Sequence, residues 1–167
     1  MSSTDLARYR PNVGVALFNR DGDVWIGRRV GDFGDSAEAA GRYAWQMPQG
    51  GVDEGESILA AARRELAEET GVENARPLVV TPGWLTYDFP SGLNSRGFRG
   101  QRQKWVAMLF DGADDEIRLD THTPEFDQWR WAPLTDTPDL IVPFKRNVYL
   151  EVAACFHPLT EFLKSKS

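Results

Sequence analysis

Residues 50–72, GGVDEGESILAAARRELAEETGV, carry the clearest structural pattern in this chain. Within it, Ser57–Thr70 is predicted to form a helix, because apolar residues recur there at helical spacing and alanines fill the middle. Ser57 is a suitable N-cap, and Gly71 is a suitable C-terminal stop. The glycine pair at positions 50 and 51 predicts a tight turn ahead of the helix. A glycine turn that leads into a helix is therefore the centre of the predicted fold.

Three carboxylates gather on one face of this predicted helix. Glu65, Glu68 and Glu69 are offset by three and four residues, which places them on neighbouring turns. Like charges at this spacing repel, so the arrangement is unfavourable unless a cation lies among them. Carboxylate oxygens are the ligands that Mg²⁺ and Mn²⁺ prefer. Taken alone, such a face is more often a solvated acidic surface, so the neighbouring residues have to decide between the two.

The neighbouring residues favour a metal site. Gly50, Glu56, Arg64-Glu65-Leu66, Glu68-Glu69 and Gly71-Val72 stand at the spacing of the complete Nudix box, without a departure. So many fixed positions in one window make a chance match very improbable. The chain therefore resembles the Nudix hydrolases, which cut phosphoanhydride bonds in nucleotide-capped polyphosphates.

The resemblance implies a role for each residue of the box. Glu65, Glu68 and Glu69 would hold Mg²⁺, or Mn²⁺ in its place, with Gly50 and Glu56 beside them. Arg64 would orient a glutamate, and Glu68 would take the proton from the attacking water. The expected catalytic residues are thus Glu68, Glu65 and Arg64.

Motifs outside the box resemble one branch of the family. They lie at residues 9–14, 45–51, 103–105, 123–127, 129–131 and 144–146. This branch joins the bacterial RNA pyrophosphohydrolases, which remove pyrophosphate from triphosphorylated RNA 5′ ends, to the dinucleoside-tetraphosphate hydrolases. We expect the RNA 5′ end as the substrate, with a role in starting mRNA decay. A dinucleoside polyphosphate is the alternative, because residues 84–90 are more similar to the second group.

The same resemblance implies substrate contacts. Glu125 matches a further carboxylate near the metal ions, although a surface acid is the alternative interpretation. Phe144 matches an aromatic side chain that stacks on the first base, and Arg29 matches a cation on the opposite side of that base. Core packing is the alternative role for Phe144. The other expected substrate contacts are Tyr87, Lys104 and Gln49.

Two other functions agree less well with the sequence. A non-catalytic Nudix domain that senses a nucleotide would be expected to lose box carboxylates, and this chain retains all four glutamates of the box. An enzyme that clears damaged small nucleotides fits the box but not the motifs outside it. Catalysis on an RNA end or a dinucleotide is therefore favoured.

The remaining pattern predicts one α/β domain over residues 1–167. Strands are expected at 13–18, 24–30, 43–47, 77–81, 84–89, 105–110 and 128–131, with the first two joined as a hairpin through Asn19–Asp23. A second, amphipathic helix is expected at Phe144–Phe156. Surface loops are expected at Gly31–Arg42 and Pro90–Gly100, the latter mobile. The resemblance implies the Nudix fold, a mixed β-sheet sandwiched between helices (α/β/α).

Composition sets broad limits on location and partners. The chain is 41% hydrophobic with a net charge of −6, which argues against nonspecific coating of nucleic acid. No apolar run approaches the ~20 residues of a membrane helix, and Met1–Arg10 is too polar for a secretory signal. The single cysteine, Cys155, is expected to be buried and forms no internal disulfide. We therefore expect a cytoplasmic protein with neither DNA nor a membrane as partner.

Overall fold

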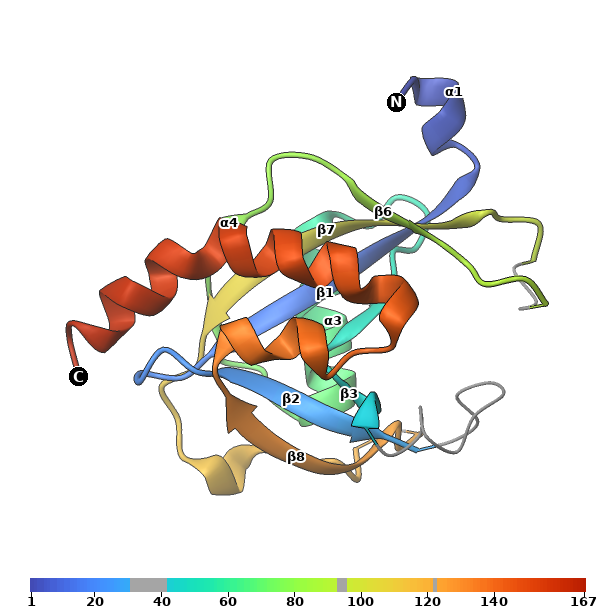
Figure 1. Ribbon diagram of the computed structural model, residues 1–167. Coiled ribbons are helices and arrows are strands. Elements are labelled where there is room, and N and C mark those ends of the chain that lie inside the picture. The colour runs from blue at the N-terminus through green and yellow to red at the C-terminus, as the bar shows by residue number, and fades with distance from the viewer. Residues whose placement is uncertain (31–41, 93–95, 122) are drawn as a thin grey trace.

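The computed structural model describes residues 1–30, 42–92, 96–121 and 123–167. Its centre is a mixed sheet of eight strands in which β1 and β7 are parallel and all other pairs are antiparallel (Figure 1). The strands are β1 (Tyr9–Phe18), β2 (Val24–Arg29), β3 (Trp45–Gln46), β4 (Gln49–Gly51), β5 (Arg76–Val80), β6 (Leu85–Asp88), β7 (Gly100–Leu109) and β8 (Phe126–Ala132). The main path runs β3-β2-β1-β7-β5, while β4 pairs with β1, β6 with β7 and β8 with β2.

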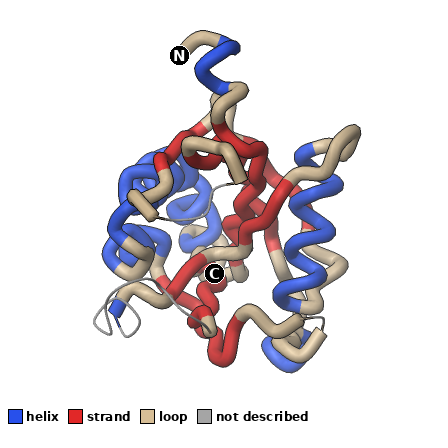
Figure 2. Tube along the Cα trace, turned by 90° about the vertical axis from the view of Figure 1, so that its right-hand side faces the viewer, coloured by secondary structure: helices blue, strands red, loops and turns tan. Residues whose placement is uncertain are grey.

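Helices cover both faces of this sheet, as Figures 1 and 2 show. Helix α3 (Ile58–Thr70) packs on one face and helix α4 (Arg146–Lys164) on the other. The remaining helical segments are α1 (Ser3–Leu6) and three 3₁₀ turns, at Asp114–Glu116, Leu134–Asp139 and Pro143–Lys145. The predicted α/β/α fold is confirmed.

Strand alternation creates two separate cores. Val13, Val15 and Leu17 of β1 pack under α3, whereas Ala16 and Phe18 pack under α4. The two sets are buried because β1 lies in the middle of the sheet, between β7 and the strands on its other side.

The predicted box helix is confirmed nearly to the residue. The Ser57 hydroxyl accepts a hydrogen bond from the Ala60 backbone N–H at 3.1 Å and so caps the first turn. Gly71 adopts a left-handed conformation with φ 72° and ends the helix. The buried side of α3 includes Ala62 and Leu66, as the apolar spacing predicted.

The predicted hairpin is only partly formed. Its turn is present, since the Asn19 side chain accepts hydrogen bonds from the backbone N–H groups of Asp21 and Asp23. The strands β1 and β2 are matched only at Phe18 and Val24, next to this turn. Further along, β4 pairs with β1, and β8 runs along β2. The splayed strands thus accept two segments from distant parts of the chain.

Two predictions about the second helix were wrong. The helix α4 runs to Lys164 rather than Phe156, because Thr160 and Leu163 continue its buried face beyond Pro158. Cys155 lies on the other side of this helix and is exposed, not buried. Local apolar composition around Cys155 did not reveal which side of the helix it occupies. Within the described residues, no helix combines the length and apolar character that crossing a membrane requires.

The two predicted loops fall only partly within the described residues. Of the loop Gly31–Arg42, the structure describes Arg42 alone, and residues 93–95 of the second loop lie outside the described part as well. The strand β7 begins at Gly100, five residues before the predicted start at Trp105. Its polar first half pairs with both β1 and β6, so strand pairing rather than apolar character extends it.

Candidate active site

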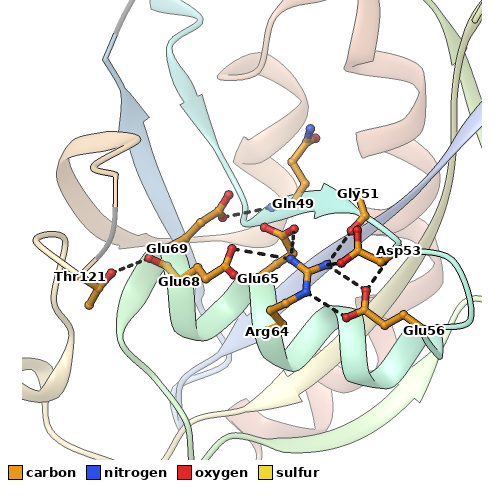
Figure 3. Close-up of polar contacts among 9 residues, drawn as sticks. All are labelled: Gln49, Gly51, Asp53, Glu56, Arg64, Glu65, Glu68, Glu69 and Thr121. Atoms are coloured by element: carbon orange, nitrogen blue, oxygen red, sulfur yellow. Dashed lines mark hydrogen bonds and ion pairs between the residues drawn. The ribbon is translucent and has the colours of Figure 1, made fainter. Parts of the chain in front are cut away.

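A cavity of about 290 Å³ lies at the C-terminal half of α3, and carboxylates dominate its lining. Its lining residues are Glu65, Glu68, Glu69, Thr123 and Glu125. Three of them come from α3, and two come from the segment before β8. The Thr121 hydroxyl donates a hydrogen bond to the Glu68 carbonyl and ties this segment to the helix (Figure 3). The structure therefore brings Glu125 to the three glutamates of the helix.

Arg64 organises the acidic residues at the front of the cavity. Its guanidinium donates to both carboxylate oxygens of Glu56 at 2.9 Å, to Glu65 Oε1 at 2.7 Å and to the Gly51 carbonyl at 2.8 Å (Figure 3). It also lies 3.6 Å from Glu68. These partners raise the pKa of Arg64, so it stays charged. Only the planar fork of an arginine can serve so many acceptors at once.

Glu56 lies on the outer side of Arg64. Its bidentate ion pair with Arg64 lowers its pKa to about 2, and it does not line the cavity. The structure thus places Glu56 as a partner of Arg64 rather than among the cavity carboxylates.

Gly50 gives Glu65 its position. A Cβ at Gly50 would overlap the carboxyl group of Glu65, so only glycine leaves room for that side chain against β4. Burial raises the pKa of Glu65 in spite of its bond to Arg64. The carboxylate is therefore confined between a glycine backbone and a guanidinium.

Glu69 lies deepest in the cavity. It is 6% exposed, and its Oε2 accepts a hydrogen bond from the Gln49 backbone N–H at 3.2 Å. Its buried Oε1 has no hydrogen-bond partner among the described residues. Burial raises the pKa of Glu69 well above its usual range, and the negative charges of Glu125 and Glu65 add to this rise.

This donor set fits a divalent cation. A buried carboxylate oxygen without a partner, beside three further carboxylates, is unfavourable without a positive charge. As the described side chains stand, no three His, Cys, Asp or Glu residues converge closely enough to hold a metal ion. Of the cavity carboxylates, Glu65 and Glu68 lie nearest to Arg64, at 2.7 and 3.6 Å.

Gln49 joins the acidic cavity to a second, aromatic part of the site. Its side-chain oxygen accepts hydrogen bonds from Lys145 Nζ at 3.3 Å and Gln103 Nε2 at 3.4 Å. Gln103 in turn donates to Asn12 at 2.8 Å. One residue of β4 thus contacts Glu69 through its backbone and Lys145 through its side chain.

The aromatic part lies at the start of α4. The Phe144 ring is 37% exposed, and its centre lies 5.7 Å from that of the buried Tyr87 ring. The ammonium of Lys145 lies 5.5 Å from the Tyr87 ring centre. Burial lowers the pKa of Lys145 to about 7, and the positive charge of nearby Arg29 contributes. Arg29, Phe144, Tyr87 and Gln49 are therefore brought to one region.

Lys104 is placed elsewhere. Its ammonium donates to the backbone carbonyls of Thr81 and Pro82 and lies 5.6 Å from the Trp84 ring centre. It neighbours Gln103 in β7, so its side chain points to the opposite face of the sheet. The structure does not bring Lys104 to Phe144 and Tyr87.

Sequence reasoning missed Lys145 and Gln103 as site residues. Lys145 stood out only as part of the motif at residues 144–146, and its side chain is buried in the structure. Gln103 is only 1% exposed, although glutamine side chains are mostly found at the surface. Its burial is visible only in the structure.

The box, the fold and the carboxylate cavity define the class. The NUDIX domain matches residues 8–152, and the chain belongs to the Nudix family of hydrolases, which generally use divalent metal ions. Among curated relatives, it is 53% identical to an RNA pyrophosphohydrolase of Caulobacter vibrioides (strain NA1000 / CB15N) over 163 residues, covering 93% of this chain and 90% of the relative. It is 48% identical to an RNA pyrophosphohydrolase of Rhizobium meliloti (strain 1021), covering 95% and 99% of the two chains.

Solved structures agree on the fold. An Ap4A hydrolase of C. elegans, in a binary complex, superposes with a TM-score of 0.60 at 16% identity, covering 89% of this chain and 98% of that one. The dihydroneopterin triphosphate pyrophosphohydrolase of E. coli also gives 0.60, at 17% identity, covering 86% and 95%.

Proposed function

We propose that this protein removes pyrophosphate from the 5′-triphosphate end of RNA, with Mg²⁺ as the cofactor and Mn²⁺ as a substitute. The observation that carries the proposal is the position of Gln49, which contacts Glu69 on one side and Lys145 on the other. A substrate that spans this point would place phosphates at the carboxylates and a base at Phe144. A nucleotide with a 5′ polyphosphate has this shape. The names of the curated relatives support RNA as the carrier of that nucleotide.

The proposal assigns a separate role to each group of residues at the site. Divalent metal ions, when bound, neutralise phosphate charge and make a water molecule a usable nucleophile. Glu65, Glu69 and Glu125 would hold them, and Arg64 keeps Glu65 in place. Glu68, whose side chain is 38% exposed beside the cavity, would take the proton from the water. Phe144 and Arg29 would hold the first base between an aromatic ring and a guanidinium.

A dinucleoside polyphosphate is the second candidate. It presents the same purine and polyphosphate to the same groups, and residues 84–90 resemble the enzymes that act on it. The two substrates differ beyond the first nucleotide, where one carries an RNA chain and the other a second nucleoside across the polyphosphate.

A direct comparison tests the proposal. We would measure Mg²⁺-dependent kcat/KM on a short 5′-triphosphorylated RNA and on diadenosine tetraphosphate. Preference for RNA, with release of pyrophosphate or phosphate, is the expected result. Preference for the dinucleotide, yielding ATP and AMP, would overturn it in favour of the second candidate.

A further inference from the structure

A second hollow lies near Asp88, the last residue of β6, and arginines dominate its lining. Its volume is about 560 Å³, and it is lined by Ala7, Arg8, Arg96, Gly97, Phe98 and Arg99. The first two residues lie between α1 and β1, and the others lie just before β7. The backbone N–H of Arg99 donates to the Arg8 carbonyl at 2.9 Å and joins the two segments.

The two segments that contain the lining residues of this hollow have a positive net charge, whereas the whole protein has a negative one. Residues 1–12 and 84–104 carry six of the 19 basic residues and only two of the 25 acidic ones. These two segments therefore carry a net charge of +4 in a chain whose total is −6. Parallel pairing of β1 with β7, from Tyr9 opposite Gly100 onward, brings the two segments together. Concentrated positive charge on an acidic protein is the electrostatic pattern of a phosphate-binding surface.

The two carboxylates of these segments, Asp5 and Asp88, already accept hydrogen bonds within the protein. Asp88 accepts hydrogen bonds from Tyr9 at 2.6 Å and from Arg99 at 2.8 Å, and Asp5 caps α1 through Ser2. The exposed Arg8 guanidinium forms no hydrogen bond or ion pair with any side chain or backbone group that the structure describes. Its charge is therefore available to an anion.

The hollow lies beyond the end of the β6–β7 strand pair that carries Tyr87 of the aromatic part. Phe89 packs against Tyr87 with ring centres 5.9 Å apart, and its backbone N–H donates to the Arg99 carbonyl at 3.0 Å. Arg99 thus lies two residues beyond Tyr87 along the β6–β7 ladder, roughly 7 Å at the rise of a strand. An RNA chain whose first base stacks on Phe144 and whose backbone continues in this direction would reach the arginines within a few nucleotides.

We propose that this arginine-lined hollow binds the phosphodiester backbone of RNA downstream of the 5′ end. The inference rests on the proposed function, since it concerns the remainder of the same substrate. It gives the enzyme a contact that an RNA chain can use and that a dinucleotide is too short to reach.

The test compares substrates of two lengths. The double variant Arg8→Glu, Arg96→Glu reverses two charges of the hollow, and Arg20→Glu, Lys166→Glu reverses two exposed charges outside it. With a 5′-triphosphorylated RNA of about twelve nucleotides, KM should rise roughly tenfold in the first variant and shift little in the second. The slope of log KM against log salt concentration should fall by about 2. On a triphosphorylated dinucleotide, both variants should match the wild type.

Two outcomes would overturn the inference. One is an unchanged KM for the longer RNA, and the other is an equal loss on both lengths, which would indicate damage to the active site. Binding of a 5′-monophosphorylated RNA of the same length, followed by fluorescence anisotropy, separates the two proposals because it needs no turnover. Weaker binding in the first variant alone would support RNA binding by the hollow, even if no RNA were hydrolysed. If RNA is hydrolysed at a rate that depends on neither RNA length nor salt concentration, the proposed function holds and the binding role of the hollow is wrong.

Discussion

The carboxyl group of Glu65 occupies the space that a Cβ would take at Gly50. The strand β4 and the helix α3 approach each other so closely at this point that the glycine and the glutamate form one unit. Because β4 is itself held against β1, the position of Glu65 depends on the sheet as well as on its own helix.

Replacing this glycine should displace the glutamate. In Gly50→Ala, we expect kcat/KM on triphosphorylated RNA to fall about 100-fold or more, since small displacements of catalytic groups have effects of this size. The matched control is Gly83→Ala, because a Cβ there meets no atom within 4 Å. Steady-state kinetics and circular dichroism of both variants provide the check. Equal activity of the two alanine variants would contradict the role of Gly50.

Arg64 should act through geometry rather than charge alone. In Arg64→Lys, one ammonium replaces a fork that serves Glu56, Glu65 and the Gly51 carbonyl. We expect kcat to fall roughly 10- to 100-fold, with a smaller change in KM. The control is Arg63→Lys on the same helix, where the guanidinium donates to the Ala75 carbonyl at 3.4 Å. A lysine variant of Arg64 with wild-type kcat would show that charge suffices.

Glu68 is the proposed base, and its removal should leave the fold intact. The side chain is 38% exposed and contacts Arg64 only at 3.6 Å, so Glu68→Gln removes little packing. Turnover should fall by about 100- to 10,000-fold. The exposed Glu73 offers the control variant Glu73→Gln. Thermal unfolding should give similar midpoints for both variants, and near-normal turnover in Glu68→Gln would exclude this residue as the base.

Phe144 should contribute to base binding. In Phe144→Ala, KM for triphosphorylated RNA should rise about tenfold, because a stacked base is worth ~1–3 kcal/mol. The control is Phe162→Ala on the neighbouring helix α4, 58% exposed near its C-terminal end. Kinetics on inorganic triphosphate, which has no base, would separate stacking from general damage. A comparable loss on that substrate would assign Phe144 to packing instead.

Lys145 should make stability depend on pH. Its pKa in the folded protein is about 7, below the 10.5 of an ordinary lysine, so the unfolded chain binds more protons between these values. The contribution of this group to stability is therefore complete above pH 10.5 and is lost as the pH falls towards 7. The difference in melting temperature between wild type and Lys145→Met should change in favour of the wild type as pH rises from 7 to 9.

The control for this effect is an exposed lysine. Lys166→Met should show a difference from wild type that stays constant over the same range. Thermal scans in the presence of a chelator keep bound metal ions from adding their own pH dependence. A constant difference for Lys145→Met as well would contradict the lowered pKa.

The box helix, its caps and the face that carries its glutamates could all be predicted from the sequence alone. These features depend on contacts three or four residues apart, so a local pattern suffices to define them. The motifs outside the box also identified the family and the branch, and with them the α/β/α fold. Local patterns missed the ends and faces of elements, as at Cys155 and beyond Pro158, where burial against distant strands decides.

The assembly of the site, in contrast, depends on contacts between residues far apart in the sequence. Glu125 joins the helix glutamates because β8 pairs with β2, and Gln49 reaches both Glu69 and Lys145 because β4 pairs with β1. Lys145 is buried beside Gln49 and Tyr87, which come from two distant strands. The pKa of a side chain, the space beside a glycine and the direction of Lys104 all depend on neighbours far away in the chain. Such neighbours are fixed by strand pairing and packing, which no short stretch of sequence contains.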